Sequence, residues 1–349
     1  MDWMIALNFL ILILALFSFL TILASLEKFH FNVINRSYFL KTRTIFRNNF
    51  LMDLCKSLFK KSIDKEKPYQ NVSFLCSLIS FFFSMCPFLL FSLSFEIESL
   101  SNFQFVIKPG NPLTLMYFLV SFLLGLFPLL VDSWVCGKGL SYIASTREFI
   151  WRFVLSITLF FLVISSFLSN KGPEVFQYFY FAGLDSFLSS FNWGVFRQPF
   201  GAVMFFICLT LCLAGKNHFG FSTPGTRNVI KEVGSYHNAL SFNIFKLSDN
   251  LNYLGFLLLY VFIYFGGWNS HSALDEIFSE PFLLFWVKAV LLLIKTSIVH
   301  LLVFSVYLSI PSLKWKHAVK ASLKYLMPLS VFNLVLTLVW LYTYKGTSL

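Results

Sequence analysis

Apolar segments long enough to cross a lipid bilayer recur along this chain of 349 residues and restrict the folds open to it. Each approaches the roughly 20 residues that a helix needs to span a hydrocarbon core of about 30 Å. They lie at residues 4–25, 72–95, 113–132, 150–169, 198–214, 240–267, 283–309 and 323–343. Only 12% of the residues are charged, whereas soluble domains average about 25%. The sequence therefore predicts an all-α membrane protein with eight transmembrane helices.

Basic residues lie mainly on one side of this stack of segments. The odd-numbered loops carry most of the Lys and Arg residues, ten of them in the first loop, 27–70. The even-numbered loops carry only Lys108, Lys171 and Arg197. Positive charge resists translocation, so the odd-numbered loops are predicted to face the side of insertion, and both termini the opposite side. This placement beside the membrane accounts for the net charge of +11 and argues against nucleic-acid binding.

The long first loop also contains an amphipathic segment. Its apolar residues recur every four positions, at Phe46, Phe50, Leu54 and Leu58. They share one face of a helix, while the charged residues between them lie off that face. The pattern predicts a helix at about 43–63 that lies in the membrane surface. The fifth loop, about 215–239, is polar, and no loop is long enough for a soluble domain. Residues 1–349 are therefore predicted to form a single polytopic membrane domain.

Common motifs of soluble enzymes are absent from the sequence. It has no GxxxxGKS or GxxxxGKT, no GxGxxG after a strand, no HExxH and no GxSxG. The six histidines lack metal-ligand spacing and the six cysteines form no CxxC pair, so no metal site is predicted. His300 lies inside the seventh apolar segment, but the sequence shows no partner for it.

Short motifs occur in a fixed order relative to the eight segments. In the first loop, LEK at 26–28 and Arg36 precede Asp53 and Lys56. Later motif residues are Trp134, Arg147, Gln198, Pro199, Tyr236, His237, Gly266, Gly267, Trp268, Lys295, Pro311, Lys324, Pro328, Leu329, Ser330 and Asn333. Together these motifs resemble the quinone-site membrane subunit of respiratory complex I, which is known from bacteria and from mitochondria. That family has eight spans and an amphipathic helix in its first loop, so the resemblance extends from end to end.

The resemblance implies a membrane-arm subunit of NADH:ubiquinone oxidoreductase. Proteins of this kind help to form the quinone chamber and couple quinone reduction to proton translocation. They have no catalytic residue and no redox cofactor of their own, and ubiquinone is the substrate. The residues placed at the chamber are Glu27, Lys28, Arg36, Asp53, Lys56, Phe221, Tyr236 and His237. The implied partners are other membrane-arm and peripheral-arm subunits and membrane lipids. The implied location is the mitochondrial inner membrane or, alternatively, a bacterial plasma membrane.

The chain departs from the family where carboxylates would carry protons. The family's intramembrane Glu in the fourth span falls near Ser156, and the one in the sixth span falls near Asn252. Acids of the family's fifth loop are also replaced. Ser and Asn cannot ionise, although they can hold water. A proton path would therefore need displaced charges, for which Glu232, Asp249 and Lys231 are the candidates.

Two alternative functions remain open at this point. A homologous membrane component of an energy-converting hydrogenase or of a ferredoxin-driven ion pump would keep the fold without binding a quinone, and the loss of acids fits it. A stand-alone transporter is a different class of protein. It would need a polar pathway through its own spans, which hold very few ionisable residues.

Overall fold

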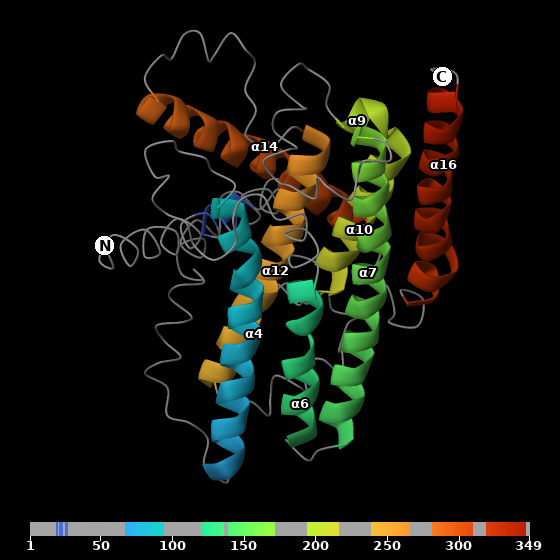
Figure 1. The fold of residues 1–349 in the computed structure, drawn as a ribbon. Coiled ribbons are helices and arrows are strands. Elements are labelled where there is room, and N and C mark those ends of the chain that lie inside the picture. Colours follow the sequence, from blue (N-terminus) through green and yellow to red (C-terminus); the bar gives the residue numbers. More distant parts are fainter. Residues whose placement is uncertain are drawn as a thin grey trace.

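The computed structural model describes residues 19, 21–23, 25–26, 67–93, 120–135, 139–171, 194–215, 239–265, 281–309 and 319–346. The described residues form helices and turns, with no strand among them (Figure 1). The predicted surface helix at 43–63 lies outside the described residues, and the predicted first span is described only in part.

The helices follow the predicted apolar segments. In chain order they are α4 (Lys67–Leu93), α6 (Phe127–Val135), α7 (Gly139–Lys171), α9 (Gly194–Arg197), α10 (Pro199–Gly215), α12 (Ala239–Phe265), α14 (Pro281–Ser309), the short π-helix η4 (Ser322–Leu326) and α16 (Met327–Gly346). Within the described ranges, three helical stretches are long and apolar enough to cross a membrane: Ser145–Ser166, Val290–Ser309 and Val319–Thr343. Shorter apolar helices cover Asn71–Pro87, Val120–Val135 and Pro199–Leu213. The described part of the chain thus has the repeated apolar helices of a multi-pass membrane protein.

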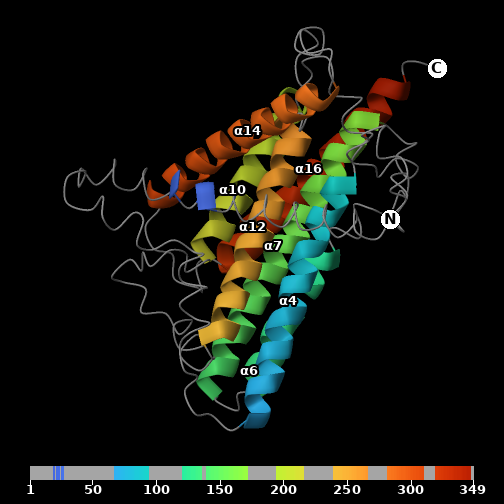
Figure 2. The same cartoon turned by 90° about the vertical axis from the view of Figure 1, so that its left-hand side faces the viewer.

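The helices alternate in direction through the bundle. In Figure 1, α4, α7 and α12 begin at the bottom of the bundle and end at the top, whereas α10 runs from top to bottom. Helix α14 lies obliquely across the other helices, as the turned view in Figure 2 shows. The beginnings of α4, α7 and α12 follow the first, third and fifth predicted loops. Their common direction therefore agrees with odd-numbered loops on one side of the membrane.

Helix α12 occupies the centre of the packing. Every residue from 251 to 264 is buried, so this helix is covered on all sides. Helices α4, α10 and α14 pack against it. Aromatic rings fill part of the interface, and the ring of Phe122 stacks on that of Phe256 with centroids 4.1 Å apart. By contrast, α16 exposes large apolar side chains such as Leu336 and Trp340. This difference places α12 away from the lipid and leaves one face of α16 uncovered by the described residues.

Two predicted spans differ from the observed helices. The third, 113–132, is not one regular helix, because a turn at Gly125 and Leu126 precedes α6. Pro128 has no N–H to continue the hydrogen-bond ladder at this point. The hydroxyl of Ser80 on α4 donates to the carbonyl oxygen of Gly125 at 3.1 Å, which gives the interrupted backbone a partner.

The fourth span, predicted at 150–169, is shorter than the helix that contains it. Helix α7 begins at Gly139, well before the apolar run. The hydroxyls of Ser145 and Thr146 both donate to the carbonyl oxygen of Tyr142, at 3.0 and 2.9 Å. These bonds satisfy the two hydroxyls within the helix, so it accommodates polar residues beyond the apolar segment.

The Leu257→Ala variant should lower the free energy of unfolding by about 2–5 kcal/mol, since it opens a cavity in the centre of the bundle. Leu257 is 0% exposed. The matched control is Leu336→Ala on α16, where the side chain is 46% exposed. That change should cost less than about 1 kcal/mol. Unfolding of the full chain in mixed detergent micelles gives both values, and equal losses would contradict the central position of α12.

Candidate functional site

A pocket opens among α7, α10, α12 and the helical segment that precedes α6. Its wall consists of Phe122, Leu126, Trp151, Arg152, Leu155, Ser156, Cys212, Asp249, Asn252, Tyr253 and Phe256. Small-molecule sites commonly combine apolar walls with a few polar groups. The pocket has this character, because aromatic and aliphatic side chains surround a small set of polar residues.

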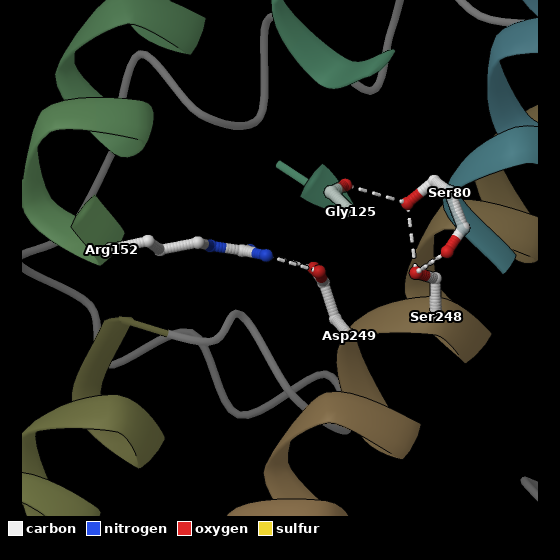
Figure 3. Close-up of polar contacts among 5 residues, drawn as sticks. All are labelled: Ser80, Gly125, Arg152, Ser248 and Asp249. Atoms are coloured by element: carbon white, nitrogen blue, oxygen red, sulfur yellow. Dashed lines mark hydrogen bonds and ion pairs between the residues drawn. The ribbon is translucent and has the colours of Figure 1, made fainter. Parts of the chain in front are cut away.

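Arg152 of α7 and Asp249 of α12 form a bidentate ion pair in the pocket wall. Nη2 of Arg152 donates to Oδ2 of Asp249 at 2.8 Å, and Nη1 donates to Oδ1 (Figure 3). Parallel bonds of this kind are among the stronger charged contacts in proteins. The two side chains are 19% and 29% exposed. Each charge is therefore stabilised mainly by the other, because most of its surroundings are protein rather than water.

The contact between Ser80 and Ser248 fixes the rotation of α12 about its own axis. This rotation directs the side chain of Asp249 toward Arg152. Ser248, the preceding residue, points to α4, where its hydroxyl donates to the carbonyl oxygen of Ser80 at 3.0 Å. The hydroxyl oxygens of Ser80 and Ser248 lie 2.8 Å apart, and Ser80 also reaches Gly125 (Figure 3). Neighbouring residues of an α-helix point about 100° apart. The contact of Ser248 with α4 consequently directs the side chain of Asp249 toward α7.

A second polar pair joins the pocket wall to α14. Oη of Tyr253 lies 3.0 Å from Nδ1 of His300, which is 1% exposed on α14. The two rings meet edge to face, with centroids 5.6 Å apart. This contact supplies the partner for His300 that the sequence did not show. Since Tyr253 also lines the pocket, the pair extends the polar wall toward α14.

A model of the NADH dehydrogenase family matches residues 46–338. The chain belongs to this family. One similar protein is the H subunit of NADH-quinone oxidoreductase from Campylobacter jejuni subsp. jejuni serotype O:23/36 (strain 81-176), which is 24% identical over 156 residues. That alignment covers 42% of the chain and 40% of the relative, so it spans less than half of the relative's length. The matched family region includes the whole pocket.

Two residues of the pocket stand where the resemblance places acids of the NADH dehydrogenase family. Ser156 follows Arg152 by one turn of α7, and Asn252 follows Asp249 by nearly one turn of α12. Residues three or four apart share a helix face, so all four line the same pocket. Among the described residues, the buried Oδ1 atom of Asn252 has no hydrogen-bond partner. Arg152 and Asp249, the charged residues of this pocket, thus lie about one turn away from the replaced acids.

The structure describes one of the predicted site residues. Asp249, a predicted proton-path residue, lies in the pocket against Arg152. The others, Glu27, Lys28, Arg36, Asp53, Lys56, Phe221, Lys231, Glu232, Tyr236 and His237, lie outside the described residues. Arg152 was not predicted, although a basic residue within an apolar segment is a signal of function. Across the described ranges, no three His, Cys, Asp or Glu side chains gather as metal ligands would.

Proposed function

We propose that the chain is a membrane-arm subunit of NADH:ubiquinone oxidoreductase, the proton-translocating complex I of a respiratory chain. The family match over 46–338 and the name of the Campylobacter relative support this proposal. The chain would form a single domain of eight transmembrane helices, with the helix at 43–63 on the membrane surface. It would lie in the mitochondrial inner membrane or in a bacterial plasma membrane, among other membrane-arm and peripheral-arm subunits.

The observation that carries the proposal is an ion pair within a largely apolar pocket. Rings such as Phe122, Trp151 and Phe256 suit the apolar tail of a quinone, whereas Arg152 and Asp249 suit polar groups or water. The pocket lies near the middles of α7 and α12 and reaches Cys212 near the end of α10. The proposed quinone chamber also includes Glu27, Lys28, Arg36, Asp53, Lys56, Phe221, Tyr236 and His237. These residues would guide ubiquinone and balance charge, while a protein of the peripheral arm would supply the electrons.

Proton translocation would use Asp249, with Glu232 and Lys231 of the fifth loop. A carboxylate that is partly removed from water can exchange a proton when its surroundings change. Ser156 and Asn252 would hold water beside Asp249, in place of the family's acids. The hydroxyl of Tyr253 would extend this polar route to His300, 3.0 Å away.

Tagging the full chain and solubilising its native membranes mildly tests the assignment. The tag should migrate in a large assembly that oxidises NADH with an artificial acceptor, and NADH-binding subunits should co-purify with it. Co-purification with hydrogenase or ferredoxin-oxidising subunits would contradict the NADH assignment. Migration as a free chain of 40.4 kDa would contradict any complex and favour a transporter.

A further inference from the structure

A separate polar cluster lies where α7, α10, α12 and α16 meet. Its side chains are Ser165, Gln198, Tyr264 and Asn333, which are 0%, 6%, 0% and 3% exposed. Gln198 and Asn333 belong to the motifs singled out in the sequence, and neither lines the pocket. Ser165 and Tyr264 lie further along α7 and α12 than the ion pair does. The cluster therefore occupies the other half of the bundle, toward the end where α10 begins.

Ser165 of α7 binds both α16 and Gln198, the residue between α9 and α10. The side-chain amide of Asn333 donates to the hydroxyl of Ser165 at 2.7 Å. The side-chain amide of Gln198 donates to the carbonyl oxygen of Ser165 at 3.2 Å. The hydroxyl of Ser165 donates in turn to the carbonyl oxygen of Leu162 at 2.8 Å. These bonds orient the amides of Gln198 and Asn333, so the remaining polar atom of Gln198, Oε1, has a defined position.

Two polar atoms of the cluster are buried without a hydrogen bond to any described residue. They are Oε1 of Gln198, an acceptor, and Oη of Tyr264, a donor. A buried polar atom without a partner destabilises a fold, and most such atoms in folded proteins bind protein or ordered water. Both atoms lie close to Gly201 of α10. A Cβ at Gly201 would lie 3.0 Å from Oη of Tyr264 and 3.2 Å from both Oε1 of Gln198 and Nδ2 of Asn333.

We propose that a single water molecule binds among these polar atoms, further from the Cα atom of Gly201 than a Cβ would lie. The water would accept a hydrogen bond from Tyr264 and donate one to Gln198, with the second N–H of Asn333 as a further donor. Buried waters typically make about three hydrogen bonds to groups that would otherwise be unsatisfied. Gly201 suits the site because it has no side chain to crowd the three polar atoms. The water joins α12 and α16 to Gln198, the residue just before α10, and Ser165 extends the connection to α7.

A map of the intact native complex at about 2 Å resolution tests the site directly. A water peak should lie about 2.6–3.2 Å from Oη of Tyr264 and from Oε1 of Gln198. An empty site would overturn the proposal. A direct hydrogen bond from Tyr264 to Gln198 would also overturn it, since neither atom would then need a water.

The sign of a stability change provides an independent test. If Tyr264 binds the water, Tyr264→Phe removes one of its partners and should lower the thermal midpoint of the complex by roughly 2–4 °C. If the hydroxyl is merely unsatisfied, removing it should leave the midpoint unchanged or raise it, which would overturn the proposal. Tyr260→Phe is the matched control, because Tyr260 lies one turn earlier on α12 and its ring also contacts Phe205. Its shift should be smaller. Should Tyr264→Phe fail to assemble, the map of the native complex decides.

Discussion

Replacing Asp249 by Leu is expected to lower the free energy of unfolding by about 3 kcal/mol, because the guanidinium of Arg152 loses its counter-charge. Breaking a fully buried pair costs roughly 3–5 kcal/mol. The partial exposure of both side chains, 19% and 29%, places the expected cost at the lower end of that range. Unfolding of the full chain in mixed micelles measures the loss, and the amount of chain accumulating in native membranes should fall with it.

The double variant, with Arg152→Leu added to Asp249→Leu, is the matched control. Apolar side chains of similar size often replace a buried ion pair at little cost, so the double variant should recover most of the lost stability. The difference between the double variant and the two single variants is the coupling energy of the pair. Simple addition of the two single losses would contradict the ion pair.

The same double variant distinguishes a role of the ion pair in stability from a role in proton transfer. If it assembles, the complex should still oxidise NADH with an artificial acceptor. Under the proposed function it should translocate fewer protons per electron, because both charges of the pocket are gone. An unchanged ratio would remove Arg152 and Asp249 from the proton path without affecting their role in stability.

Gly194→Ala is expected to cost about 3 kcal/mol, since overpacking against a rigid neighbour is destabilising. A Cβ at this position in α9 would overlap the carbonyl oxygen of Ile263 and lie 3.3 Å from the Cα atom of Tyr264. Both are backbone atoms of α12. That stretch of helix is buried on all sides, so it cannot move away from the added methyl group.

Gly125→Ala is the control for this substitution. A Cβ there would meet its nearest neighbours at 3.4 to 3.6 Å, which is ordinary contact. The change should therefore alter the free energy of unfolding by less than about 1 kcal/mol. Denaturant titration of the two variants in the same detergent compares them. Equal losses would show that α9 does not approach the backbone of α12 closely.

Helix positions and family could be predicted from the sequence because both depend on local features. An apolar run of about 20 residues is sufficient to indicate a membrane helix, whatever packs against it. The described helices accordingly follow the apolar segments, and the family match confirms the family indicated by the ordered motifs. The common direction of α4, α7 and α12 also follows from the order of the spans along the chain (Figure 1). The quinone-chamber residues stay a prediction.

The contacts of the pocket required the tertiary structure. Arg152 and Asp249 are 97 residues apart, and Tyr253 and His300 are 47 apart. The rotation of each helix decides whether such residues meet, and contacts such as Ser80 with Ser248 set that rotation. Hydropathy shows little of this, because lipid and protein interior are similarly apolar and a central helix resembles a lipid-facing one. Apolar runs and ordered motifs are thus sufficient to show that this chain forms membrane helices of a known family. Only the packing decided that α12 lies at the centre and which polar groups share a pocket.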